Sequence, residues 1–114
     1  MSKQELPYAI VDLLEEKKGE DILLLDLKGV SGFCDYFVFC TGTSDRMLDA
    51  LADDLVRKLR KSHQVKGNLE GRSMDGWILV DYGNVVVHLF SPDQRDYYAL
   101  EELWQDGKAL VHIQ

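Results

Sequence analysis

The amino-acid sequence predicts an α/β domain in which a mixed β-sheet is flanked by helices. Three segments carry apolar residues at helical spacing, and the short apolar runs between them have the length of strands. The chain has 114 residues, of which 46% are hydrophobic and 29% charged, and it shows no repeat, linker or low-complexity segment. We therefore assign residues 1–114 to a single domain, which is large enough to form a core without a metal or a disulfide.

The N-terminal third of the chain predicts one helix followed by two strands. Residues 2–5 have the form of a capping box, and apolar residues follow at helical spacing up to Gly19, which we expect to end the helix. Residues 22–27 and 33–40 are the predicted strands. The second strand is apolar on both faces except at Asp35, which is typical of a strand covered on both sides.

The middle of the chain predicts a long helix that Thr43 and Ser44 can cap and that runs to about Ser62. Acidic residues occupy its early turns and basic residues its last turns, which complements the helix dipole. The residues expected to face the sheet are Leu48, Leu51, Ala52, Leu55 and Leu59. Residues 65–73 are predicted to form a loop or a short edge strand.

Residues 76–90 are predicted to form a β-hairpin with Gly83 and Asn84 at its turn. In that register Val80 faces Val87, so that one face of the hairpin is entirely apolar. The other face combines apolar residues with an acid and an imidazole: Trp77, Leu79, Asp81, Val86, His88 and Phe90. This mixture suggests a surface for recognition.

The C-terminal segment begins with a second capping box, Ser91 to Gln94, with Pro92 at the first helical position. We expect one helix from there to about Trp104, followed by a short strand or tail at residues 108–113. Tyr97, Leu100 and Trp104 are expected to face inward. Gly107 is expected to end the helix.

The net charge and the cysteines of the chain indicate which binding partners and which cellular compartment to expect. A net charge of −7 disfavours a nucleic-acid backbone and favours a basic protein as partner. Cys34 and Cys40 lie six positions apart in one predicted strand, too far for a disulfide, and are expected to be buried thiols in a reducing compartment. We find neither a secretory signal nor an apolar run long enough to span a membrane, so we expect the protein in the cytoplasm.

The chain carries no recognisable pattern for catalysis. The turn at residues 42–45 could hold an anion at a helix N-terminus, but a capped helix start is the favoured interpretation because Asp45 would repel an anion. Asp49 and Asp53 share a helix face, which we interpret as solvated rather than metal-binding. The cysteines and histidines lack metal-ligand spacing, and no serine-nucleophile motif is present. We therefore expect no metal, no cofactor and no enzymatic activity.

Two further features allow more than one interpretation. The basic cluster at residues 57–61 could touch ribosomal RNA peripherally, although pairing with the helix dipole and solubility together are a sufficient explanation. His88 could form a hydrogen bond with Asp81 beneath the C-terminal helix, or it could belong to an exposed interface anchored by Trp77. The residues alone leave both interpretations of His88 open.

Several segments taken together resemble the ribosomal silencing factor family, also called Iojap-related. Each motif is weak alone, but their combination and order are specific, and they cover most of residues 5–106. They are Asp35 to Val38 leading to Thr41 to Ser44, then Glu70-Gly71, Trp77 to Phe90, and Arg95 with Tyr98 to Trp104. The positions that match the family's motif, and that we take as candidate partner-binding residues, are Trp77, Asp81, His88, Arg95, Tyr98, Leu100, Glu101 and Trp104.

The resemblance implies a fold related to nucleotidyltransferases but without their catalytic residues. It also implies binding to the large ribosomal subunit through the basic ribosomal protein numbered fourteen. A protein docked there blocks joining of the small subunit and lowers translation when nutrients are scarce. Relatives in organelles are associated with large-subunit assembly.

The leading hypothesis is therefore a translational repressor that acts by steric occlusion. A large-subunit assembly factor that uses the same dock is the first alternative, and an enzyme acting on nucleotides is the second. A homodimer is a further expectation when no ribosome is available, because an exposed apolar face could pair with itself.

Overall fold

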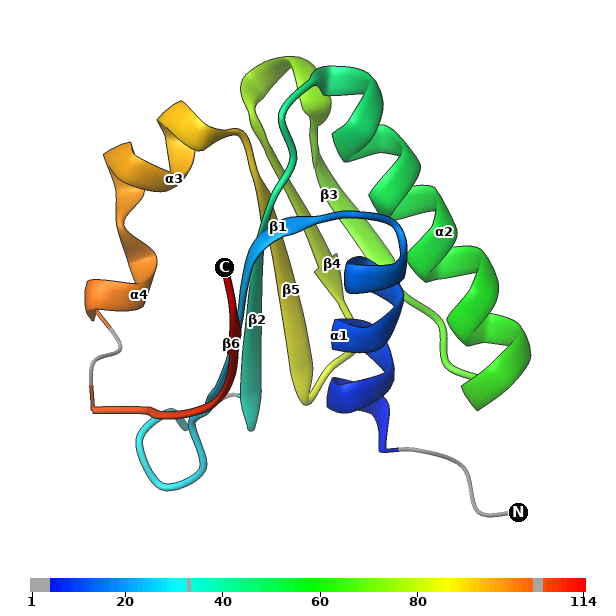
Figure 1. Ribbon diagram of the computed structural model, residues 1–114. Helices are drawn as coiled ribbons and strands as arrows, with labels where there is room; N and C mark the ends of the chain where they lie inside the picture. Colours follow the sequence, from blue (N-terminus) through cyan, green and yellow to red (C-terminus); the bar gives the residue numbers. More distant parts are fainter. Residues whose placement is uncertain (1–4, 33, 104–105) are drawn as a thin grey trace.

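The computed structural model describes residues 5–32, 34–103 and 106–114. Helices are interspersed among the strands along the chain, as Figure 1 shows. Their order is α1 (Leu6–Glu16), β1 (Glu20–Asp26), β2 (Tyr36–Thr41), α2 (Asp45–His63), β3 (Asn68–Arg72), η1 (Ser73–Asp75), β4 (Trp77–Asp81), β5 (Val85–Phe90), α3 (Pro92–Tyr98), α4 (Leu100–Leu103) and β6 (Lys108–Ile113).

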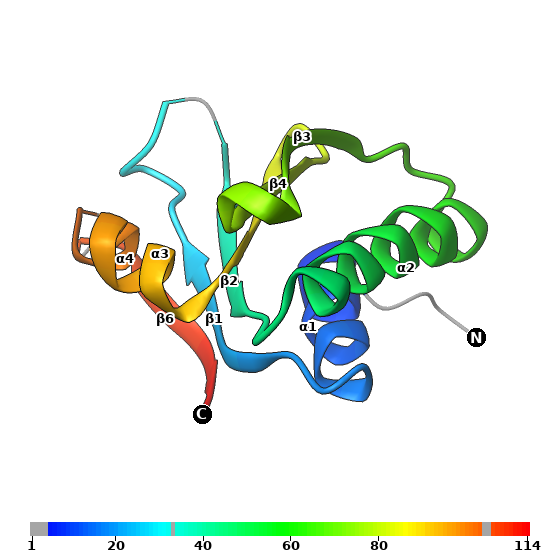
Figure 2. The ribbon, with the colours of Figure 1, turned by 90° about the horizontal axis from the view of Figure 1, so that it is seen from above.

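The six strands form one mixed sheet in the order β3-β4-β5-β2-β1-β6. The pair β2 and β5 is parallel, whereas the other four neighbouring pairs are antiparallel. Helices α1 and α2 lie on one face of the sheet, and the shorter α3 and α4 lie on the other (Figure 2). The predicted fold class, an α/β domain with a mixed sheet between helices, is confirmed.

The larger core lies between the sheet and the helices α1 and α2. The N-cap of α2 is Ser44, whose hydroxyl accepts a hydrogen bond from the backbone N–H of Met47 at 3.1 Å. All five predicted apolar residues of this helix are buried against the sheet. They pack with alternate residues of the central strands, among them Val38, Val80 and Val87.

The second core lies on the opposite face of the sheet, under α3, α4 and the loop that joins β1 to β2. It is built from the other alternate residues of β1, β2 and β5, together with two residues of that loop, Leu27 and Cys34. The strand residues are Leu23, Leu25, Phe37, Phe39, Val86 and Phe90. The central strands are therefore apolar on both sides, as the sequence predicts. Cys34 and Cys40 are both buried free thiols, although Cys34 precedes β2 instead of belonging to it.

The ends of α1 differ from the sequence prediction. The helix begins at Leu6 after Glu5, which makes no side-chain cap, while residues 2–4 of the expected capping box lie outside the described residues. At the other end the helix stops at Glu16, because Lys18 adopts the left-handed conformation (φ 66°) and the N–H of Gly19 bonds to Leu14 O at 2.8 Å. Gly19 must lack a side chain, because a Cβ there would lie 2.4 Å from Cys40 Sγ.

The C-terminal segment also departs from the prediction of one helix. Ser91 caps α3 as expected, but Ala99 adopts the left-handed conformation (φ 44°) and separates α3 from α4. Tyr97 is 78% exposed instead of facing inward, Leu100 packs on the second core, and the prediction for Trp104 lies outside the described residues. The two segments predicted as either a strand or an irregular segment, residues 65–73 and 108–113, both contain a strand. The first contains β3, an exposed edge strand, and the second forms β6, the other edge of the sheet, beside β1.

Within the described ranges, we find no helix with the length and apolarity that crossing a membrane requires.

Candidate partner-binding surface

The β4–β5 hairpin places the recognition residues on the sheet face that carries α3 and α4. Ile78 pairs with Leu89 and Val80 with Val87, which is the register predicted from the Gly-Asn turn. The N–H of Tyr82 bonds to Val85 O at 2.9 Å and closes the turn. As a consequence Trp77 lies opposite Phe90, and Leu79 lies opposite His88.

His88 occupies the centre of an aromatic cluster beneath this face. Its ring stacks on Phe39 with 5.1 Å between ring centroids and meets Phe37 edge-on at 4.7 Å. The indole Nε1–H of Trp77 donates a hydrogen bond to His88 Nδ1 at 3.3 Å. His88 is only 4% exposed, and burial lowers the pKa of its imidazole to about 4. The imidazole is therefore neutral near pH 7, as its role as an acceptor for Trp77 requires.

His88 and Asp81 do not form the hydrogen bond that the sequence allowed. Asp81 Oδ1 instead accepts from the backbone N–H of Gly83 at 2.7 Å, which stabilises the hairpin turn. The alternative that His88 itself lies at an exposed interface is also wrong, because His88 is 4% exposed. Its imidazole is buried in the core, and it supports from below the half-exposed indole of Trp77.

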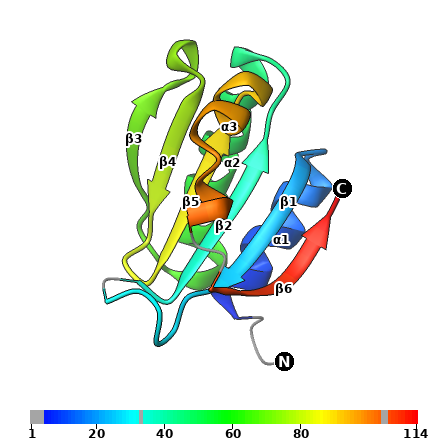
Figure 3. The same ribbon diagram turned by 90° about the vertical axis from the view of Figure 1, so that its left-hand side faces the viewer.

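Trp77 forms the boundary between this cluster and the surface. Its ring lies 5.0 Å from Phe90 and 4.7 Å from Tyr98, measured between centroids. Tyr98 is 42% exposed, and its neighbour Tyr97 is more exposed still. Figure 3 shows that α3 and α4 lie over β5 and leave β3 and β4 uncovered on this side. The molecule therefore presents a strip of aromatic side chains beside an open part of its sheet.

A hollow of about 200 Å³ adjoins Trp77 on that open part. Its lining consists of Glu70, Gly71, Trp77 and Leu79. Glu70 pairs with Leu79 across the two strands, so that its carboxylate stands on the same face as the indole. Gly71 has φ +87°, and a Cβ there would lie 2.4 Å from Trp77 O, so that only glycine allows this close pairing. The sequence interpretation did not select Glu70 as a site residue, although Glu70-Gly71 is one of the segments that carry the family resemblance.

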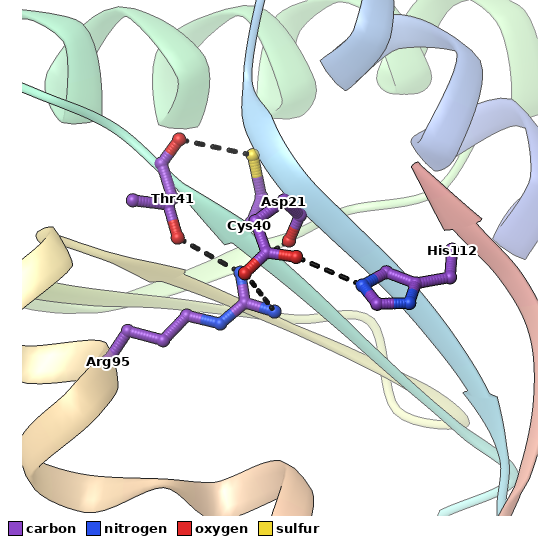
Figure 4. A network of polar contacts seen from close by, with 5 residues as sticks. All are labelled: Asp21, Cys40, Thr41, Arg95 and His112. Atoms are coloured by element: carbon purple, nitrogen blue, oxygen red, sulfur yellow. Dashed lines mark hydrogen bonds and ion pairs between the residues drawn. The ribbon is translucent and has the colours of Figure 1, made fainter. Parts of the chain in front are cut away.

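Arg95 is buried and belongs to a separate polar network, drawn in Figure 4. Its guanidinium reaches from α3 to the sheet, where it donates to Thr41 Oγ1 at 3.0 Å and to the backbone carbonyl of Asp21. The Asp21 carboxylate lies 3.6 Å from Arg95 and 3.0 Å from His112 Nε2. Asp21 itself has the left-handed conformation (φ 48°), next to an irregularity in the β1–β2 pairing. The network thus ties α3, β1, β2 and β6 together.

The structure therefore divides the eight candidate residues into groups. Trp77, Tyr98 and Leu100 lie close to the same part of the surface, and Asp81 lies at the far end of β4. His88 and Arg95 are buried, so that in this conformation they position other groups and do not face a partner. The side chain of Glu101 and all of Trp104 lie outside the described residues.

Two of the helix carboxylates, Asp49 and Asp54, have protein partners. Asp49 accepts from Ser73 Oγ at 2.9 Å, and Asp54 pairs with Lys17 and Arg57. Among the residues that the structure describes, no group of three or more His, Cys, Asp and Glu side chains could hold a metal ion.

Solved structures place this fold among known α/β proteins. A crystal structure of a protein from Chromobacterium violaceum superposes with a TM-score of 0.84 at 38% identity and covers 92% of this chain and 88% of its own. A crystal structure from Bacillus halodurans gives a TM-score of 0.75 at 39% identity, with 90% of this chain and 95% of its own covered. Both identities are high enough to indicate relatedness beyond the fold.

Family comparison then gives a specific assignment. The model of the family "Ribosomal silencing factor during starvation" matches residues 1–114. The ribosomal silencing factor RsfS of Halalkalibacterium halodurans is 40% identical over 94% of this chain and 92% of its own length. A mouse protein named "Mitochondrial assembly of ribosomal large subunit protein 1" is 38% identical over 83% of this chain and 43% of its own length. The chain belongs to the ribosomal silencing factor family, RsfS.

Proposed function

We propose that this chain represses translation by binding the large ribosomal subunit and sterically blocking its association with the small subunit. The dock is the basic ribosomal protein numbered fourteen, and the repression operates under nutrient limitation or in stationary phase. The action takes place in the cytoplasm and involves no catalysis. Membership of a family named for ribosomal silencing supports the class of function.

The observation that carries the proposal is the half-exposed Trp77 beside an open part of the sheet. The indole is held from below by the hydrogen bond to His88 and from the side by Tyr98. An aromatic ring that is already fixed before binding loses little conformational freedom on docking, which favours a role as an anchor. Anchors of this kind commonly cost about 2 kcal/mol or more of binding free energy when they are truncated.

Charge supports a basic partner for the same surface. The chain has a net charge of −7, and Glu70 lines the hollow beside Trp77, while the cation on this face, Arg72, pairs with Asp75. We also assign Asp81, at the far end of β4 from Trp77, and Glu101 to contacts with basic groups. Opposite charges raise the rate of encounter and fix the orientation of docking.

The size of the molecule is sufficient for a stable complex. A standard interface buries roughly 800 Å² on each partner. The chain has an accessible surface of 6720 Å², of which such an interface would be a small part. A protein of this size bound at the face between the subunits would exclude the small subunit by volume alone.

Subunit reassociation tests the proposal directly. Purified small and large subunits are mixed with and without the protein, at a magnesium concentration that favours joining, and are separated on a sucrose gradient. We expect the subunits to stay apart and the protein to migrate with the large subunit. Normal joining with no protein bound would contradict the proposed dock.

A role in assembly of the large subunit is the second candidate. The name of the mouse mitochondrial relative favours it. In that case the protein would prefer immature particles to mature subunits, and mature subunits would join normally with the protein still bound. Tight binding of a nucleoside triphosphate with magnesium, measured by calorimetry, would instead indicate an enzyme.

A further inference from the structure

The C-terminal half of α2 and the turn after it form a strongly basic surface on an acidic protein. Residues 55–67 contain no Asp or Glu, whereas the first half of the helix carries four aspartates. We call this surface the basic end of α2 and define it by Arg57, Lys58, Arg60, Lys61 and Lys66. It lies on the face of the sheet opposite to Trp77, because α2 and α3 cover opposite faces (Figure 2).

These side chains are available to a partner. Leu55 and Leu59 are buried against the sheet, so that the basic residues between and beyond them occupy the outer side of the helix. Arg57 pairs with Asp54, which also receives Lys17. For the other four cations, the described part of the chain supplies no ion pair. Lys58 is half-buried, and Arg60, Lys61 and Lys66 are exposed.

The helix dipole explains only part of this charge. Its effect is confined to the last turn, where Arg60, Lys61 and His63 lie. Lys58 lies before that turn, and Lys66 follows the helix in the connection to β3. Lys58 and Lys66 therefore lie beyond the part of the helix where the dipole acts, and their charge is available for another role.

The chemistry of the surface distinguishes among anionic partners. A helix that binds a membrane surface exposes apolar residues for insertion, but the large apolar residues of α2 are directed into the core. What remains outside is a row of long cationic side chains, with three- and four-residue spacings that place neighbours about 5–6 Å apart. Lysine and arginine arranged in this way are the usual contacts to successive phosphate groups of a nucleic-acid backbone.

We propose that the basic end of α2 is a second docking surface, which binds backbone phosphates of RNA on the large ribosomal subunit. The proposal rests on the proposed function, because that function brings the chain to a particle made largely of RNA. The two docking surfaces lie on opposite faces of the sheet, so that a basic protein at Trp77 and RNA at α2 can be bound at the same time. The contact adds affinity and orientation without reading a base sequence.

The test measures the dissociation constant for purified large subunits as a function of salt concentration, between about 50 and 200 mM. The variant combines Lys58→Gln with Lys61→Gln, which keeps helix propensity while removing two charges. We expect several-fold weaker binding at low salt and a slope of log Kd against log salt that is smaller by about 2. The control combines Lys28→Gln with Lys108→Gln, which makes the same change of net charge away from α2 and should keep the wild-type slope.

The outcomes separate this proposal from the proposed function. A wild-type chain that does not bind large subunits overturns both. A wild-type chain that binds with the same salt slope as the Lys58 and Lys61 variant overturns only the RNA contact. A photo-reactive benzoylphenylalanine in place of Ser62 identifies the partner: a cross-link to RNA supports the proposal, and a cross-link to protein alone contradicts it. Equal melting temperatures of variant and control exclude a folding defect.

Discussion

The indole of Trp77 donates its hydrogen bond to Nδ1 of a histidine that is almost fully buried, at 3.3 Å. Because Nδ1 of His88 accepts this bond, the neutral imidazole carries its proton on Nε2. In the described structure Nε2 is buried without a hydrogen-bond partner. The half-exposed indole of the candidate surface is therefore fixed by a buried group that must stay neutral.

This arrangement predicts that the protein loses stability as pH falls. The loss occurs over the pH range in which His88 is protonated in the unfolded chain but not in the folded chain. Burial lowers the pKa of His88 in the folded state to about 4, from an ordinary value of 6.5. Between these values the unfolded chain binds a proton that the folded chain does not, so the free energy of unfolding decreases as pH falls. The full effect is on the order of 3 kcal/mol. Urea unfolding at pH 7 and pH 4.5 measures it.

His88→Phe is the matched variant for that measurement. Phenylalanine retains a ring between Phe37 and Phe39 but cannot bind a proton. We expect a smaller change in stability between the two pH values than in the wild type, even if the variant is less stable at both. Identical pH dependence in the two proteins would show that another group is responsible.

Truncation of the aromatic strip should separate binding from folding. Tyr98 is 42% exposed and contacts Trp77 at the edge of the surface, so Tyr98→Ala should reduce stability little. If it is an anchor, binding to large subunits should weaken by about 2 kcal/mol, which is roughly thirtyfold in Kd. Sedimentation with purified large subunits measures the loss, and circular dichroism verifies the fold. Wild-type affinity would remove Tyr98 from the surface.

Trp77→Ala combines two effects, and Trp77→Phe distinguishes them. The indole stacks on Phe90 and bonds to His88, so that the alanine variant loses packing as well as any contact with a partner. Phenylalanine retains the stacking and removes only the N–H donor. We expect the phenylalanine variant to fold and to bind better than the alanine variant. Unfolding of Trp77→Ala without any binding defect in Trp77→Phe would make Trp77 a core residue.

The Glu70 carboxylate beside Trp77 predicts a salt-dependent contribution to binding. Glu70→Gln keeps the size of the side chain that lines the hollow and removes its charge. We expect affinity for the large subunit to fall several-fold at low salt and the difference to shrink as salt increases, because exposed charges are screened. Glu16→Gln, on α1 at the other face, is the control with the same change of net charge. Equal effects of the two substitutions would indicate a general effect of charge.

The features that the sequence predicted correctly are those with local causes. The Gly-Asn turn sets the hairpin register, and strand alternation then decides which residues share a face with Trp77. Helix α2 follows from the capping hydroxyl of Ser44 and from a regular apolar stripe. Both features depend on residues close together in the chain, which is why a single sequence contains them.

The features that it missed depend on contacts between distant segments. Arg95 lies 74 positions from Asp21 and 54 from Thr41, and nothing near Arg95 in the sequence indicates that its side chain is buried. The break at Ala99 likewise follows no glycine or proline, so the periodicity suggests one continuous helix. Glu70 became a candidate only when the pairing of β3 with β4 placed it beside Trp77.

Arg95 should act on binding through the position of α3 rather than by touching the partner. Its guanidinium joins the helix to Thr41 and Asp21, three residues before Tyr98. Arg95→Leu removes these bonds and leaves the Thr41 hydroxyl buried without its donor, which should cost about 2 kcal/mol of stability. It should also weaken binding to the large subunit, because the helix that carries Tyr98 is no longer tied to the sheet. Arg95→Lys retains the charge but not the planar fork and should recover only part of both losses. Full binding by a folded Arg95→Leu variant would show that the network stabilises the fold without positioning the surface.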